Sequence, residues 1–133
     1  MAPVWLFSEP GSSLPPVEHP FGALLDADDD KWANEADLRR AAGMLIEAGC
    51  RWIVCFGARS EDVHDRIDDY IVEQSVFTGR TDYKGVVTTF HADESADDVA
   101  EFFVTCALQD MRGALILVQD KEKWAAALSR VTA

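Results

Sequence analysis

A run of five apolar residues, Trp52–Phe56, lies near the middle of the chain and is ended by Gly57. Most of its residues are β-branched or aromatic and none is polar, which favours a strand that is buried on both faces. Such strands are usually central in parallel sheets with helices above and below. Ser60, Glu61 and Asp62 follow and are typical of a helix start, because a hydroxyl can cap the helix and carboxylates favour its positive end. The run therefore predicts a strand–turn–helix unit.

The same alternation of patterns extends along the chain. Short apolar runs predict strands at residues 4–7, 52–56, 86–90 and 114–118, and helical spacing predicts a helix after each strand. We therefore predict an α/β fold of flavodoxin-like or Rossmann-like type, βαβαβαβα, with a small four-stranded parallel sheet and helices on both faces. For the strand order we adopt 2-1-3-4, which places the first strand centrally.

Side chains that can cap helices mark the predicted helix starts. The first helix begins near Asp30 or at Asn34, and both starts remain open. Ser95 and Asp98 form a capping box for the third helix, and Asp120 caps the fourth. Apolar residues of the third helix recur at helical spacing and should be buried: Val99, Phe102, Phe103 and Cys106.

Residues 8–30 depart from the alternation. They contain four of the five prolines and several glycines and serines, which cannot sustain a long helix or a central strand. We predict a long loop within a single domain spanning 1–133. Phe21, Leu24 and Leu25 should anchor part of this loop to the core. The only regular structure that we assign to this part is a single helical turn.

The chain is strongly acidic, with 24 acidic and 12 basic residues and a formal net charge of -12. A surface of this sign repels nucleic acid and attracts basic proteins, although solubility alone also explains it. No apolar run approaches the length of a membrane span, and the N-terminal run has no signal-peptide pattern. We expect a cytoplasmic monomer or homodimer with a possible basic protein partner, no nucleic acid and no membrane contact.

Metal and redox sites are not expected. Cys50, Cys55 and Cys106 lack paired spacing and lie in predicted core segments, so they should be buried free thiols. The acidic run at 26–30 lacks the glycine and distal glutamate of a calcium loop. His64 and Asp68, one helical turn apart, make at most half a metal site. We predict no metal and no cofactor.

Polar residues follow the predicted strand ends, where parallel sheets bind ligands. These residues are Glu9, Arg59, Ser60, His91, Asp93 and Asp120. The strand order 2-1-3-4 brings Glu9 towards His91, so Glu9, His91 and Asp120 are the candidate catalytic residues. Arg59, Ser60 and Asp93 are the candidate ligand-binding residues, because an arginine and a helix N-terminus favour anions.

Structural explanations exist for the same residues. Ser60 and Asp120 are explained as helix caps, and Asp93 as ordinary loop polarity. No dinucleotide-binding glycine motif, P-loop or nucleophile elbow is present in the chain. The sequence therefore commits to no catalytic residue and favours a protein without enzyme activity.

Three segments together resemble an uncharacterised bacterial family of small α/β domains. They are Cys50-Arg-Trp-Ile-Val-Cys-Phe-Gly57, His64-Asp65 with Asp68, and Val87-Thr-Thr-Phe-His91 before an aromatic-rich helix. The resemblance covers about residues 50–107. It implies a bacterial, intracellular, single-domain protein without established activity, and it assigns no role to the histidines and aspartates.

Two functions from different classes follow. The first is a small acidic module that binds and regulates or neutralises a basic protein. The second is a domain that binds a small molecule or phosphate, or a hydrolase-type enzyme, with its site at the carboxyl ends of the strands. The first is preferred because the chain combines small size and strong acidity with no catalytic signature.

Overall fold

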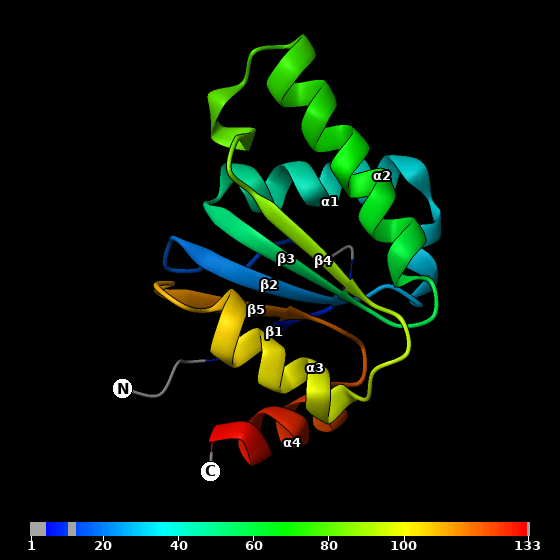
Figure 1. Ribbon diagram of the computed structural model, residues 1–133, viewed down its shortest axis with the longest axis vertical. Coiled ribbons are helices and arrows are strands. Elements are labelled where there is room, and N and C mark those ends of the chain that lie inside the picture. The colour runs from blue at the N-terminus through cyan, green and yellow to red at the C-terminus, as the bar shows by residue number, and fades with distance from the viewer. Residues whose placement is uncertain (1–4, 11–12, 133) are drawn as a thin grey trace.

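The computed structural model describes residues 5–10 and 13–132 and contains one parallel sheet (Figure 1). Within these residues the sheet has five strands in the order β1-β5-β2-β3-β4. The strands are β1 (Trp5–Ser8), β2 (Phe21–Asp26), β3 (Cys50–Phe56), β4 (Val87–His91) and β5 (Gly113–Leu117). An α/β fold with a parallel sheet is thus confirmed, but with five strands rather than four.

Helices cover both faces of the sheet. Helices α1 (Glu35–Glu47) and α2 (Ser60–Val72) lie on one face, and α3 (Ala96–Phe102) and α4 (Lys121–Thr132) on the other (Figure 1). Short helical segments are η1 (Asp30–Ala33), η2 (Glu73–Phe77), η3 (Thr81–Tyr83) and η4 (Phe103–Ala107). No helix among the described residues has the length and apolar character needed to cross a bilayer.

Strand β2 corrects the prediction of a loop over residues 8–30. Residues 21–25 are all buried, and β2 pairs with β3 on one side and β5 on the other. Gly22 weakens the strand pattern in the sequence, but it leaves room for a neighbouring side chain. A Cβ there would lie 2.8 Å from Leu108 Cδ2, which follows η4.

The predicted strand order 2-1-3-4 is wrong. Strand β1 is not central but lies at an edge and pairs with β5. Strands β3 and β5, which contain the two long apolar runs, point the same way but are separated by β2 rather than adjacent. The four predicted strands stand in the order first, fourth, second, third, with the missed strand β2 between the fourth and the second.

The segment between β1 and β2 takes the place of a helix on the α1 face. Leu14 and Val17 pack against the apolar cluster that α1 and α2 form with the sheet. Val17 and Glu18 also lie against Gly113 at the start of β5, where a Cβ would stand 2.4 Å from the Glu18 carbonyl oxygen. This part of the sheet is therefore covered by an irregular segment.

Three of the predicted caps are confirmed. Asn34 accepts the backbone N–H of Asp37, Ser95 that of Asp98, and Asp120 that of Lys123. The Asn34 start of α1 is thus the observed one of the two alternatives.

Two of the three cysteines are buried, as predicted. Cys50 and Cys55 are buried, and burial raises the pKa of the Cys50 thiol to about 12. Cys106 is exposed, contrary to prediction. The reason is the change from α to π geometry after Phe102: Phe103 is buried as predicted, but the inward face then passes to Ala107 instead of Cys106.

Candidate functional site

The sheet separates Glu9 from His91. Glu9 follows β1 and His91 ends β4, and these strands are the two edges of the sheet. Four strand spacings amount to about 19 Å. The prediction that Glu9 and His91 converge is therefore wrong, because it depended on β1 being central.

The carboxylate beside His91 comes from Glu94. His91 Nδ1 lies 2.5 Å from Glu94 Oε2, and Nε2 lies 3.2 Å from Thr89 Oγ1. The indole Nε1 of Trp52 donates to the same Thr89 oxygen at 3.5 Å. The imidazole is buried and packs on Phe102, with ring centroids 4.6 Å apart. Because both ring nitrogens already have protein partners, this hydroxyl–imidazole–carboxylate chain fixes the end of β4.

The turn from β3 to α2 is capped by a distant carboxylate. Asp28 accepts the backbone N–H groups of Ala58 at 3.0 Å and Arg59 at 2.8 Å. Gly57 adopts a φ of 115°, and a Cβ there would lie 2.6 Å from Asp28 Oδ2. Asp28 thus occupies the donors that an anionic ligand would use at this helix start.

Arg59 and Ser60, which were predicted to bind a ligand, lie among groups of the protein itself. The Arg59 guanidinium donates to the Asp28 carbonyl and lies 3.5 Å from Asp30 Oδ1. Ser60 is the first residue of α2 and is fully buried, and its hydroxyl has no hydrogen-bond partner in the described part of the chain. Its predicted role as the cap is wrong, since Arg59 holds that position without a side-chain cap.

The other two candidates lie apart from one another. Asp120 caps α4 below the sheet, with its Oδ1 3.1 Å from the Lys123 nitrogen. Asp93 is exposed in the loop between β4 and α3. The six residues singled out from the sequence therefore lie on the side of the sheet where the strands have their carboxyl ends, without forming one cluster.

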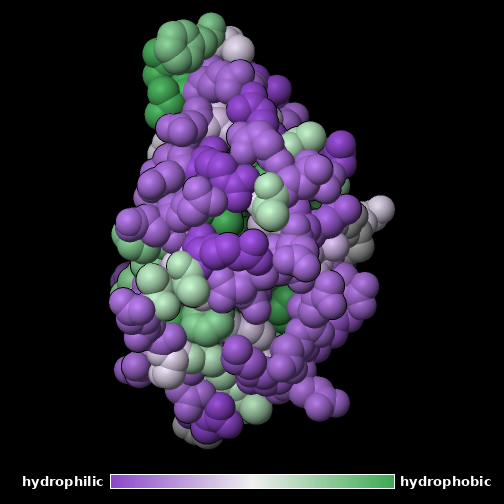
Figure 2. Space-filling view, turned by 90° about the vertical axis from the view of Figure 1, so that its right-hand side faces the viewer, coloured by the Kyte–Doolittle hydropathy of each residue, from purple (hydrophilic) through white to green (hydrophobic). Residues whose placement is uncertain are grey.

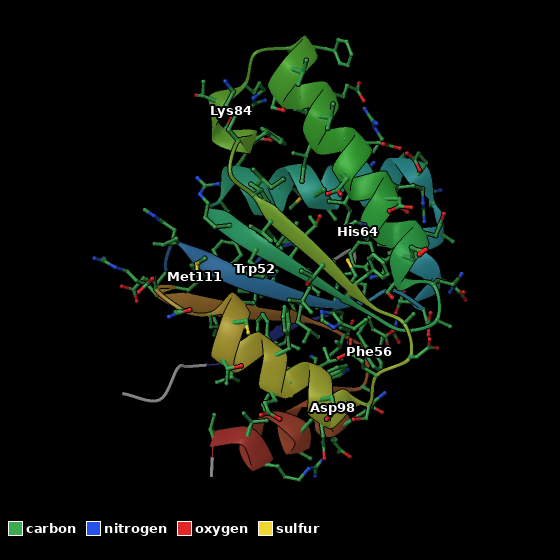
Figure 3. All side chains as sticks on the ribbon, viewed as in Figure 1. Trp52, Phe56, His64, Lys84, Asp98 and Met111 are labelled. Carbon is green, nitrogen blue, oxygen red and sulfur yellow. The ribbon has the colours of Figure 1, made fainter. Side chains whose placement is uncertain are left out.

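Asp26 ends the central strand at this edge and is partly buried. Desolvation raises the pKa of its carboxyl group, against the opposing effect of the Asp28 backbone N–H, which donates to it at 3.0 Å. Nearby, Phe56 and Trp124 meet edge to face with ring centroids 4.9 Å apart, and Lys123 Nζ lies over the Phe56 ring (Figure 3). The sequence gave no signal for Asp26 beyond membership of an acidic run.

Replacing Asp26 with asparagine should stabilise the protein at neutral pH. The folded-state pKa is raised, so wild-type Asp26 favours folding most when protonated, and that contribution is lost as pH rises through the folded pKa. The gain of the variant should thus shrink as the pH falls through this value. Urea unfolding of both proteins across the acid pH range measures the difference in their free energies of unfolding. A stabilisation that grows as the pH falls would contradict the raised pKa of Asp26.

The outer edge of β4 has no partner strand among the described residues. The His91 carbonyl accepts the Gly57 N–H at 3.2 Å and so faces β3. Because backbone groups of alternate residues point to opposite sides of a strand, those of Thr88 and Phe90 point outwards. Val87 and Phe90 are 40% and 41% exposed on opposite faces of the strand. Sequence reasoning missed this edge because it follows from strand order.

Carboxylates line both sides of this edge. On α2, His64 packs against Phe90 with ring centroids 4.9 Å apart and lies within 3.4 Å of the Asp65 and Asp68 oxygens (Figure 3). Asp68 also accepts from the Thr88 hydroxyl. On the other face, Glu94 binds His91 at the end of β4, whereas Asp97 of α3 pairs with Arg130 of α4. The side reached by the carboxyl ends of the strands is predominantly hydrophilic (Figure 2).

Comparison with known proteins gives a family but no activity. A family model described as a domain of unknown function, DUF7684, matches residues 4–133. No curated protein and no solved structure matches the chain. The match agrees with the uncharacterised family expected from the sequence and extends over far more than residues 50–107.

Proposed function

Since the chain belongs to a family of unknown function, DUF7684, we propose its function from its own surface: it is a module that binds an extended basic segment of another protein along the outer edge of β4. The single observation that carries the proposal is the unpaired edge of β4, flanked by the acidic surface of α2 on one face and by Glu94 on the other. This proposal sharpens the acidic regulatory module expected from the sequence.

The backbone of β4 suits strand addition. An added strand gains affinity from main-chain hydrogen bonds, and Thr88 and Phe90 direct their backbone groups outwards. Natural sheet edges are usually protected by lysine, proline or a bulge. The sequence of β4, Val-Thr-Thr-Phe-His, contains neither lysine nor proline, and its register with β3 is regular from Val87 to His91.

The charge around β4 selects the kind of partner. Asp65 and Asp68 on one side and Glu94 on the other would attract lysine and arginine side chains on an added strand. The net charge of -12 also opposes the approach of a second copy of the same chain. Acidity therefore favours a basic partner over self-association at this edge.

We also propose that the fold is Rossmann-like and that the protein is cytoplasmic. Strands β2, β3 and β4 proceed in one direction from β2, and β5 lies on the other side. This is the order 3-2-1-4 of the Rossmann half-fold, to which β1 is added beyond β5. The binding proposal does not depend on either assignment.

Replacing Phe90 with proline should weaken binding of a lysine–valine alternating peptide about tenfold more than replacing it with alanine. Both variants lose the ring, but only proline removes the outward N–H, and an edge position with that geometry tolerates proline. Fluorescence anisotropy of the labelled peptide at low salt measures the affinities. Circular dichroism and thermal unfolding check that each variant is folded.

Two controls make this experiment decisive. A glutamate–valine peptide of the same length should not bind, and added salt should weaken binding of the lysine peptide. On binding, hydrogen exchange at the Thr88 and Phe90 amides should slow, while exchange at Thr89 and His91 should not change. Equal loss in the proline and alanine variants, or protection elsewhere on the surface alone, would refute the β4 site.

A further inference from the structure

A pocket lies on the α1 face, away from the β4 edge. Its volume is about 40 Å³, and Leu14, Trp32 and Leu117 contribute to its walls. These residues come from the β1–β2 segment, from η1 and from the end of β5. Along α1 the wall continues through residues 37, 40, 41, 44 and 45, which recur on one side of the helix. The pocket thus occupies the seam between α1 and the irregular segment that replaces a helix.

The position of this pocket in the sheet is one where open parallel sheets bind ligands. From β2 the chain passes through η1 and α1 to β3 on one side, while β5 lies on the other side of β2. Ligands bind outside the carboxyl ends of strands where the order changes direction in this way. Trp32 shortly after β2 and Leu117 at the end of β5 place the pocket at that point.

The polar groups of the pocket favour an anion. Asp37 Oδ2 lies 3.4 Å from Lys31 Nζ, and Asp37 Oδ1 lies 3.1 Å from the Arg40 guanidinium. All three residues line the pocket, so two cations share one carboxylate in a protein whose net charge is -12. This local excess of positive charge runs against the sign of the surface as a whole.

The indole of Trp32 provides a probe of this pocket. It is 1% exposed, and its indole Nε1 is buried without a hydrogen-bond partner among the described residues. Buried donors are normally satisfied, and an exception requires an explanation. The Trp32 ring forms part of the pocket wall, so the NMR signal of this enclosed N–H reports on a ligand bound there.

We infer that this pocket binds a short-chain aliphatic carboxylate. A volume of about 40 Å³ corresponds to roughly three water-sized positions, enough for a short hydrocarbon tail. Leu14, Met44 and Leu117 provide apolar contacts for that tail. The carboxylate lies at Lys31 and Arg40, whose side chains are 44% and 67% exposed. The site is separate from the β4 edge and does not rest on the protein-binding proposal.

Butyrate and its neutral isostere butyramide test this inference. In a titration followed by ¹H–¹⁵N NMR, butyrate should shift the Trp32 indole signal in a saturable manner and bind about tenfold more tightly than butyramide. Replacing Arg40 with glutamine should abolish most of that difference. Equal affinity for the two compounds, or the absence of saturable shifts with butyrate, would overturn the inference.

A second variant separates pocket binding from general attraction to cations. Ala41→Leu adds bulk to the wall of the pocket on a helix that accepts leucine well, and it should weaken butyrate binding about tenfold. The matched control is Arg130→Gln, which removes a cation paired with Asp97 on the opposite face of the sheet. That control should leave butyrate affinity unchanged. Undiminished binding by folded Ala41→Leu would place the ligand elsewhere and refute the site.

Discussion

Replacing Leu24 with alanine should lower the free energy of unfolding by about 2–5 kcal/mol. Leu24 is fully buried in the central strand β2, between Val54 of β3 and Ile116 of β5. Its side chain belongs to the apolar cluster on the face covered by α3 and α4. The variant would lose these contacts and leave a cavity that the paired strands cannot readily close.

Equilibrium unfolding in urea measures this loss, with Leu14→Ala as the control. Leu14 lies in the irregular segment before β2 and is only partly buried, so its truncation should cost clearly less. If residues 21–25 were an anchored loop, as the sequence suggested, the two variants would be similar. A loss below about 1 kcal/mol for Leu24→Ala is the size expected of a surface position and would contradict a central β2.

The second large effect is expected from Gly57→Ala, with a loss of about 2–4 kcal/mol in the free energy of unfolding. At a φ of 115° an L-residue is strained, and the added methyl group would lie 2.6 Å from Asp28 Oδ2. The carboxylate must then move away from the N–H groups of Ala58 and Arg59. Both the backbone strain and the lost cap contribute to the effect.

A double-mutant cycle with Asp28→Ala separates these two contributions. Asp28→Ala alone should cost about 1–2 kcal/mol, because two backbone donors lose their acceptor. In the double variant the methyl group no longer meets a carboxylate, so the combined loss should fall short of the sum by about 1 kcal/mol. Strict additivity in urea unfolding would show that Gly57 and Asp28 act independently.

The parts of the fold that the sequence predicts correctly depend on local interactions. Asn34, Ser95 and Asp120 cap helices through contacts three residues away, so their roles are visible in the sequence itself. Strand β3 is equally local, since five consecutive apolar residues favour a buried strand whatever its neighbours are. These features need no knowledge of strand order.

Strand β2 was missed because its stability comes from its neighbours. Gly22 and Ala23 have low strand propensity, and prolines precede the segment. Pairing on both sides and full burial of residues 21–25 outweigh these local preferences. The closeness of η4 and Leu108 to Gly22 is likewise a tertiary contact that no short window of sequence records.

The candidate site was only partly predictable for the same reason. Placing polar residues at the carboxyl ends of strands requires only the strand boundaries, and these were nearly right. Pairing Glu9 with His91 required the strand order, which is set by long-range strand pairing and was predicted wrongly. The cap from Asp28 to Arg59 spans 31 residues, so the sequence indicated Ser60 instead.

The place of β5 in the sheet has a consequence for how the chain is made. This strand is the last to be synthesised, yet it lies between β1 and β2 and pairs with both. A nascent chain that has emerged only as far as α3 therefore offers β1 no neighbour and leaves one side of β2 bare. The sheet can be completed only once residues 113–117 have left the ribosome, so β1 has no strand to pair with until then.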